Sequence, residues 1–261
     1  MHYSTPITQR LKKLIRSLHQ KQYRDHHSLF IAEGEKLCAE LLKSDYITET
    51  IVFREMPSSD VIDIVEAFTD KGVPINSAPK HLFDQMCEAK TPQGIIAIVN
   101  KKPSKINKKG SFIILDNISD PGNVGTIIRT AEWFGIKQVF LVGDCADHFS
   151  PKAVRSSMGS VFRLNIQHVD GITDFLNKNF PNIPIFGGSL EAKKTIDTLS
   201  PKGQCGIVFG SESHGISETL NKVITEQFVI KGVGSSDSLN VAVAVGITLF
   251  HFNLSSKSTK K

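Results

Sequence analysis

The second half of the chain alternates short apolar runs with helical patterns, and this alternation is what most constrains the fold. The apolar runs are typical of strands buried on both faces, and they are Phe112–Leu115, Gln138–Val142, Ile183–Phe186, Gly206–Phe209 and Gln227–Ile230. Helical patterns lie between them at Val124–Phe134, Pro151–Met158, Thr173–Lys178 and Ser217–Val223. The alternation predicts a doubly wound parallel α/β sheet, in which ligands bind at the carboxyl ends of the strands.

The end of the chain is also patterned. Asn240–Phe252 is apolar on every side, which predicts a buried helix, and Ser255–Lys261 is polar, which predicts a frayed tail. Thr248 and His251 interrupt the apolar stretch, which is too short to cross a bilayer. We therefore do not expect a membrane protein.

The first half predicts a smaller α/β domain that ends near residue 100. Ile7, Leu11, Leu14, Ile15 and Leu18 recur at helical spacing, and Gly94–Val99 is typical of a buried strand. Residues 101–110 hold five lysines, a proline and a glycine, a composition typical of a linker. A length of 261 residues suits two domains: residues 1–100, a linker at 101–110, residues 111–255, and a tail at 256–261.

Basic side chains are concentrated at the start of the chain. Residues 1–24 carry six lysines and arginines and no acidic residue, which favours contact with a polyanion such as nucleic acid. A solvated helix face is an equally good interpretation of the charge alone. A mitochondrial presequence is a third interpretation. It is disfavoured because the charged helix runs directly into folded sequence at Phe30.

The four cysteines are widely spaced and form no CxxC pair, which argues against a zinc ribbon or a dithiol redox motif. Four reduced thiols in a cytoplasmic protein are expected. No metal site is predicted.

Three loops that follow predicted strands carry polar residues. In the first, Asp120-Pro121-Gly122 predicts a turn before a helix whose free amides, with Asn123 and Arg129, would suit a phosphate. The alternative is a well-capped helix with a surface arginine, and the residues alone favour this alternative.

The second loop, Phe209–Gly215, contains serine and histidine but lacks the GxSxG spacing of a hydrolase. Its glycines predict close approach of backbone to a ligand, around a buried Glu212. The third loop, Ile230–Asn240, has an incomplete dinucleotide fingerprint, which makes nicotinamide binding improbable, and the chain contains no phosphate-binding GxxxxGK[ST] loop. Ser238 and Asn240 fit a polar site at the mouth of the last helix.

Taken together, the three loops resemble the three motifs of the SpoU/TrmH family of RNA 2′-O-ribose methyltransferases. The matching segments are Asp120–Ala131, Val208–Gly215 and Ser238–Ala244. In the first half, Lys21–Arg24, Phe30–Lys36 and Thr91–Gly94 look like the RNA-binding domain that often precedes this catalytic domain.

The resemblance implies a C-terminal α/β domain with a trefoil knot, and a homodimer whose site lies at the subunit interface. The implied cofactor is S-adenosylmethionine, held mostly by backbone at Gly210, Ile230 and Leu239, with the loop at Gly187–Ser189 as a further contact. The implied partner is RNA.

The resemblance also implies roles for five side chains. Arg129 would be the base, but a guanidinium is charged and has no acceptor, so base and phosphate clamp remain alternatives. Asn123, Ser238 and Asn240 would orient ribose and phosphate, and Glu212 would order the cofactor loop. The expected activity is methylation of a ribose 2′-hydroxyl in structured RNA, with ribosomal RNA favoured over transfer RNA. The alternative is an RNA-binding module of the same fold without turnover.

Overall fold

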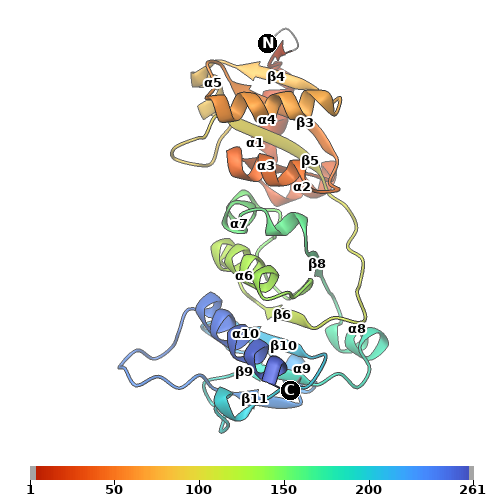
Figure 1. Cartoon of the computed structure of the whole chain (residues 1–261), viewed down its shortest axis with the longest axis vertical. Helices are drawn as coiled ribbons and strands as arrows, with labels where there is room; N and C mark the ends of the chain where they lie inside the picture. Colours follow the sequence, from red (N-terminus) through yellow and green to blue (C-terminus); the bar gives the residue numbers. More distant parts are fainter. Residues whose placement is uncertain (1–3, 259–261) are drawn as a thin grey trace. The chain divides into compact units, whose positions relative to one another are not determined.

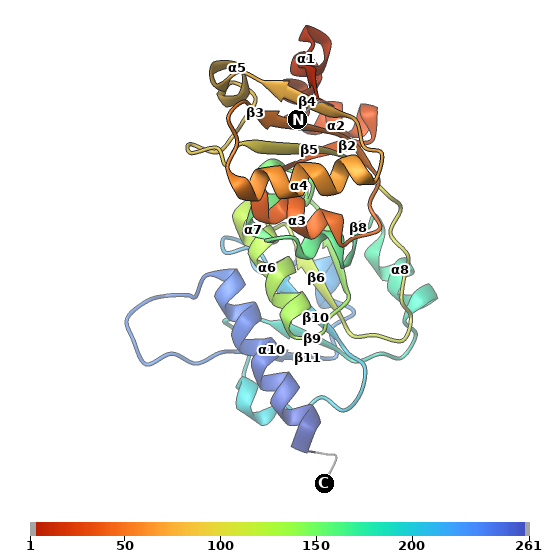
Figure 2. The same ribbon diagram turned by 45° about the horizontal axis from the view of Figure 1, so that its top comes forward.

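The computed structural model describes residues 4–258, with side chains as far as Asn253. The chain forms two compact units (Figures 1 and 2). Unit 1 contains the chain up to Pro103 together with Asp147–Phe162, and unit 2 contains Ser104–Ala146 and the chain from Arg163 onward.

Unit 1 is built on a five-stranded mixed sheet, counted over the described residues. The strand order is β1 (Thr5–Pro6), β4 (Ile75–Ala78), β3 (Thr48–Arg54), β5 (Ile95–Asn100) and β2 (Leu29–Glu33). Strand β5 is antiparallel to both of its neighbours, and the other pairs are parallel. The helices are α1 (Gln9–Ser17), α2 (Lys21–His27), α3 (Glu35–Leu42), α4 (Ser59–Asp70), α5 (Lys80–Asp84) and α7 (Pro151–Ser156), and the short η1 (Ser160–Phe162) follows α7. A small α/β unit is thus confirmed, although β1, α2, β2 and α5 match no element that the sequence predicted.

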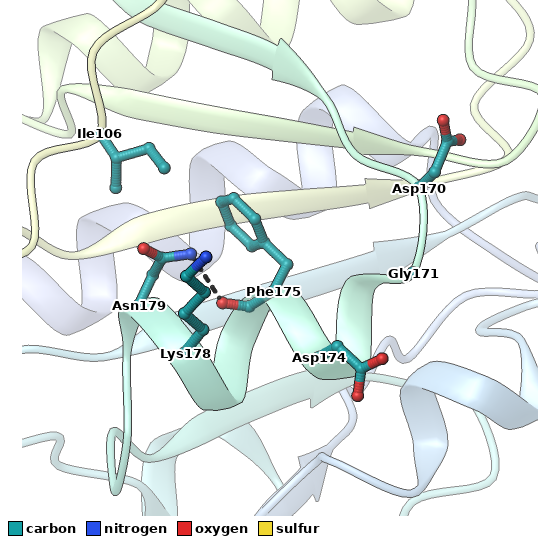
Figure 3. A pocket seen from close by; sticks show the side chains of 7 residues that line it. All are labelled: Ile106, Asp170, Gly171, Asp174, Phe175, Lys178 and Asn179. Carbon is teal, nitrogen blue, oxygen red and sulfur yellow. Dashed lines mark hydrogen bonds between the residues drawn. The ribbon is translucent and has the colours of Figure 1, made fainter.

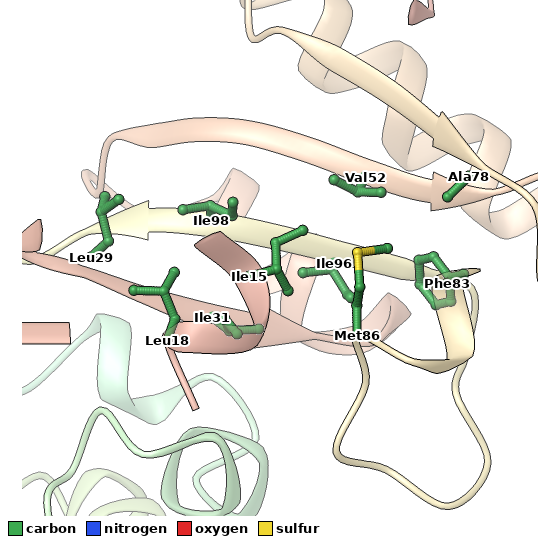
Figure 4. Packing of buried hydrophobic residues seen from close by; sticks show 10 residues of the cluster. All are labelled: Ile15, Leu18, Leu29, Ile31, Val52, Ala78, Phe83, Met86, Ile96 and Ile98. Carbon is green, nitrogen blue, oxygen red and sulfur yellow. The ribbon is translucent and has the colours of Figure 1, made fainter. Parts of the chain in front are cut away.

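The N-terminal helix is part of the core of unit 1. Ile15 and Leu18 are fully buried and pack in one cluster with Ile31 and Ile98 of the sheet (Figure 4). The basic side chains of Arg10, Lys13 and Arg16 are exposed on the other side. Because α1 buries apolar surface that the sheet needs covered, its apolar side chains are accounted for by the folding of unit 1.

The segment Asp147–Phe162 packs with unit 1, although its sequence position placed it in the second domain. Phe30 of β2 stacks on Phe149 and Phe162, with ring centroids 4.4 and 6.3 Å apart. Arg24, 3% exposed, donates from Nε to the Asp147 carboxylate at 2.9 Å. The expected domain boundaries did not separate this segment from unit 2, because the aromatic stacking and the buried ion pair join residues more than 100 positions apart. No local sequence pattern indicates such contacts.

The lysine-rich stretch is fixed to the folded units over much of its length. In unit 1, Lys101 pairs with Asp25 at 2.6 Å and Lys102 pairs with Asp45. In unit 2, the amide of Asn107 donates to the side chain of Gln138 at 3.0 Å. The division between the units falls at Pro103, inside the predicted linker.

Unit 2 carries a six-stranded sheet, counted over the described residues, in which every pair is parallel. The order is β11 (Glu226–Phe228), β9 (Ile185–Gly188), β10 (Gly206–Gly210), β6 (Phe112–Asp116), β7 (Gln138–Val142) and β8 (Asn165–His168). Its longer helices are α6 (Pro121–Trp133), α8 (Ile172–Asn179) and α10 (Val241–Ser258). The short helix α9 (Glu218–Asn221) lies between β10 and β11, and η2 (Ile196–Thr198) lies between β9 and β10. The predicted parallel α/β sheet is confirmed. Strand β8 was missed because polar residues alternate with its apolar ones.

Helix α10 differs from its prediction in two ways. It packs against α6 and β10 (Figure 2), but Val243 and Phe250 are 50% and 57% exposed, so the predicted burial on every side is wrong. A uniformly hydrophobic helix gives no sequence signal for its outer face. Within residues 4–253, no side chain covers the exposed apolar face of this helix fully. The helix continues to Ser258, so the predicted frayed tail is wrong for Ser255–Ser258; residues 259–261 lie outside the described residues. No helix in the described part of the chain is long and apolar enough to cross a membrane.

Replacing Asp147 by Asn should destabilise unit 1 by about 3–5 kcal/mol at pH 7, because Arg24 would remain buried without a counter-charge. Burial alone would raise the pKa of Asp147, but the charge of His148, the Phe149 N–H and the Arg24 guanidinium together lower it. Because the pKa of Asp147 is lower in the folded state than the unfolded value of about 4, its carboxylate contributes its full stabilisation above that value. This stabilisation is lost as the pH falls through the folded pKa.

Denaturant unfolding at pH 7 and pH 3 checks this prediction. The difference between wild type and Asp147→Asn should shrink in acid. The control is Asp25→Asn, which removes an exposed partner of Lys21 and Lys101 and should cost at most about 1 kcal/mol. Equal losses for the two variants at pH 7 would contradict the assignment.

Candidate active site

Parallel pairing brings the first two predicted loops to one edge of the sheet. Strands β6 and β10 are neighbours, and Asp116 lies opposite Gly210 in register. The loops that follow them therefore start side by side, at the carboxyl ends where ligands bind in such sheets.

The first loop ends in a capped helix. Asp120 accepts a hydrogen bond from the amide of Asn123 at 2.8 Å, and Pro121 occupies the first helical turn. Helix α6 thus begins three residues earlier than expected, and one of its end amides is satisfied within the chain. The capped-helix alternative is correct in this respect.

Asn240 joins all three loops. Its side-chain amide donates to Oδ1 of Asn123 at 3.0 Å and to Oε1 of Glu212 at 3.4 Å. Its own Oδ1 accepts from the amide of Ala242 at 2.9 Å, which holds it at the start of α10. Three side chains from loops far apart in the sequence are thereby brought into one place.

Glu212 is exposed, so the expectation of a buried acid is wrong. Its carboxylate accepts from the amide of Val241 at 3.4 Å as well as from Asn240. A carboxylate beside a helix N-terminus is favoured by the free amides and the helix dipole. Water and these donors solvate the charge, so the site does not bear the cost of a desolvated acid.

The second loop needs glycine where it leaves β10. A Cβ on Gly210 would lie 2.0 Å from the carbonyl oxygen of Gly215, a contact that no side chain tolerates. Within the same loop the amide of Gly215 donates to the Ser211 carbonyl at 2.9 Å, and the amide of His214 donates to the Ser211 hydroxyl at 3.2 Å. The loop therefore folds tightly back on itself.

In the described part of the chain, the other predicted residues make no side-chain hydrogen bond with this cluster. Arg129 is exposed on α6, and its guanidinium has no hydrogen-bond partner within residues 4–253. Ser238 lies in the exposed segment 231–240, and its carbonyl accepts from the Ser236 hydroxyl at 3.4 Å. Among the described residues, the predicted cofactor positions Gly210, Ile230 and Leu239 share no hydrogen bond with one another.

Sequence reasoning missed Asp116 and Asn117, which hold the loops in place. Asp116 is 1% exposed and accepts from the Ser217 amide at 2.6 Å and from Nδ2 of Asn117 at 2.7 Å. Asn117 adopts φ 56°, and its Oδ1 accepts from the amide of Asp144 at 2.9 Å. The sequence signal for Asp116 was an acidic residue at the end of an apolar strand. An unpaired carboxylate at such a position is costly, so a partner is expected.

A cavity of about 450 Å³ in unit 2 shares no residue with the three loops. It lies beside α8, and Figure 3 shows Asp170 and Asp174 standing apart from Lys178 and Asn179. In the described part of the chain, no group of three His, Cys, Asp or Glu residues could hold a metal ion.

Comparison with known proteins identifies the class. A parallel α/β unit with these loops matches a methyltransferase family: residues 110–250 match the model of the SpoU rRNA Methylase family, and the chain belongs to this family. Residues 9–97 match the MRM3-like substrate binding domain.

Individual relatives cover nearly the whole chain. The 23S rRNA guanosine 2′-O-methyltransferase RlmP of Bacillus subtilis is 27% identical over 90% of this chain and 93% of its own. The mitochondrial rRNA methyltransferase 3 of Xenopus laevis is 27% identical over 98% of this chain and 76% of its own. The AdoMet-bound rRNA methyltransferase structure from Sinorhizobium meliloti aligns over 96% of both chains with 28% identity and a TM-score of 0.85.

Replacing Asp116 by Ala should destabilise unit 2 by about 2–3 kcal/mol, because the Ser217 amide and the Asn117 side chain lose a buried, charged acceptor. Denaturant unfolding measures the loss. Asp144→Ala is the control, since that exposed side chain is not used by the network, and it should change stability by no more than about 0.5 kcal/mol. Equal losses of stability in the two variants would contradict the role of Asp116 in holding the loops.

Proposed function

We propose that this chain transfers a methyl group from S-adenosylmethionine to a ribose 2′-hydroxyl of structured RNA, with ribosomal RNA as the favoured substrate. The observation that carries the proposal is the bridge from Asn240 to Asn123 and Glu212, which unites the three family motifs. The Bacillus subtilis relative RlmP and the mitochondrial relative from Xenopus laevis are rRNA methyltransferases, which supports ribosomal RNA over transfer RNA.

The sheet edge suits a cofactor held by backbone. Strands β11, β9 and β10 are adjacent, and Gly188 lies opposite both Phe209 and Phe228. Strand β9 ends at Gly188, β10 ends at Gly210, and Ile230 follows β11 by two residues. The glycines at these strand ends carry no bulky side chain beside their amides and carbonyls. We propose Gly210, Ile230 and Leu239 as the main cofactor contacts. The AdoMet-bound relative supports S-adenosylmethionine as the cofactor.

The chemistry requires mainly positioning. When bound, S-adenosylmethionine supplies an activated methyl group with a neutral leaving group, so the protein must align the ribose oxygen in line with it. Asn123, Ser238 and Asn240 would orient the ribose and phosphate, while Glu212 holds the start of α10. The hydroxyl proton must pass to an acceptor.

We propose that Arg129 clamps the phosphate next to the target ribose. Its guanidinium is exposed and unpaired within residues 4–253, and guanidinium forks match phosphate geometry. A charged guanidinium has no lone pair for a proton, so a phosphate oxygen or a water would take it.

A second copy of the chain is the proposed partner of α10. Val243, Ile247 and Phe250 form an exposed apolar face on this helix, and Trp133 at the end of α6 is 85% exposed. Isolated exposed apolar side chains are ordinary, but a contiguous face with an aromatic anchor favours an interface. Helix α6 also carries Arg129, so a homodimer through this face would bring a partner close to the candidate site.

Two further features of the family are proposed for this chain. The segment that follows β11 would thread through a loop of unit 2 to form a trefoil knot, which the return of α10 onto α6 and β10 supports. We place the protein in the cytoplasm. All four cysteines are free, and burial raises the pKa of the Cys145 and Cys205 thiols, as suits a reducing compartment.

Arg129→Ala should lower the rate of methyl transfer to ribosomal RNA at least about 100-fold, a loss typical of a removed transition-state contact. S-adenosylmethionine affinity, measured by calorimetry, should stay within about twofold, since the cofactor contacts lie elsewhere. Arg129→Lys should retain part of the rate if the residue is a clamp, because it keeps the charge.

Thr126→Ala is the matched control, one turn earlier on the same helix and equally exposed. It should leave transfer unchanged. Full activity of Arg129→Ala would exclude the assigned role, and cofactor or RNA binding without any methyl transfer by the wild type would favour a binding module instead.

Val243→Glu combined with Ile247→Glu should convert a dimer to a monomer, because two desolvated carboxylates oppose burial of the α10 face. Sedimentation equilibrium measures the change. Leu190→Glu, at a 67% exposed leucine elsewhere in unit 2, should leave the mass unchanged. A monomeric wild type would rule out the proposed interface.

A further inference from the structure

Unit 1 contains a cavity of about 360 Å³ with a charged lining. It lies among the carboxyl end of β3, helix α5 and the loop that precedes β5. Its charged lining consists of Arg54, Lys80, Asp84 and Lys90. Three cations against one carboxylate give the cavity a positive balance, which suits an anionic ligand.

The walls of the cavity are held in place by buried contacts. Glu33, 7% exposed at the end of β2, accepts hydrogen bonds from the amides of Glu88 and Ala89 at 3.1 and 3.3 Å. The amide of Arg54 donates to the Gly94 carbonyl at 2.9 Å. The lining loop is therefore fixed from both ends, and a ligand would not bear the cost of ordering it.

The cations of the lining are only partly used within the chain. Lys80 pairs with Oδ2 of Asp84 at 2.6 Å. Within residues 4–253, neither the half-buried guanidinium of Arg54 nor the exposed ammonium of Lys90 has a hydrogen-bond or ion-pair partner. An arginine withdrawn from water without a partner is costly, and its fork is well suited to a phosphate.

The carboxylate of Asp84 supplies a second, independent feature. Its Oδ1 is buried and has no hydrogen-bond partner among the side chains and backbone that the structure describes. Buried polar atoms are almost always satisfied, so this oxygen is available to a ligand group that donates an N–H or O–H. A simple anion such as inorganic phosphate leaves that acceptor unused, whereas a nucleotide offers both a phosphate and donors on its ribose and base.

We propose that this cavity binds one unpaired nucleotide of the RNA substrate. Its phosphate contacts Arg54 and Lys90, and a ribose hydroxyl or base N–H donates to Oδ1 of Asp84. The inference rests on the proposed function only for the source of the nucleotide. A free mononucleotide carries the same chemistry, and the experiment separates the two sources.

The test measures binding of 5′-fluorescein-labelled octauridylate RNA to the full chain by fluorescence anisotropy. Arg54→Ala combined with Lys90→Ala should weaken binding about tenfold or more and reduce the salt slope by about 0.7 for the phosphate contact that is lost. The control, Lys43→Ala combined with Lys71→Ala, removes two exposed lysines of unit 1 outside the cavity. Thermal melts establish that both variants fold. Equal Kd values for the two double variants would overturn the proposal.

Competition identifies the ligand. Uridine monophosphate should displace the labelled RNA from the wild type at lower concentration than inorganic phosphate, and Asp84→Asn should reduce that difference. Equal competition by the two compounds would overturn the role of Asp84. Uridine monophosphate binding that is lost in the Arg54/Lys90 variant, with RNA affinity unchanged, would overturn RNA as the source.

The experiments distinguish failure of the nucleotide cavity from failure of the proposed methyltransferase function. Methyl transfer to ribosomal RNA by the wild type, with no effect of the Arg54/Lys90 variant on RNA affinity, would refute the nucleotide cavity alone. Loss of RNA affinity in that variant, with no methyl transfer by the wild type, would refute the enzyme and support the cavity.

Discussion

The parallel pairing of β6 with β10 is the constraint on which the rest of the site depends. It sets Asp116 opposite Gly210, so that two loops nearly a hundred residues apart in sequence start at the same edge. The buried Asp116 carboxylate then fixes the second loop through the Ser217 amide. Only with both loops held can the single amide of Asn240 reach Asn123 and Glu212.

Polar side chains divide into two groups by their partners. Those that shape the scaffold are saturated: Asp116 and Glu33 accept from backbone amides, and Arg24 is held by Asp147. Those assigned to RNA, Arg129 in unit 2 and Arg54 in unit 1, have no partner among the described residues. Unsatisfied guanidinium groups keep their hydrogen-bonding capacity for a ligand, and the two units share this arrangement.

Several elements were predictable because their signals are local. Strands β6, β7 and β10 are largely apolar runs, and the start of α6 is set by its own residues, the cap Asp120 and Pro121. The errors arose where the determinant was distant. Glu212 was expected to be buried, but it lies exposed beside the start of α10, and the outer face of α10 follows from which side meets α6.

The sequence by itself determined a parallel α/β sheet and three polar loops at strand ends, since periodicity, turn residues and apolar runs act within a few neighbours. The tertiary structure decided which side chains meet. Asn240 reaches partners 28 and 117 residues away, and Phe149 leaves its neighbours in sequence to stack on Phe30. Such contacts depend on strand order and packing, which no short window of residues contains.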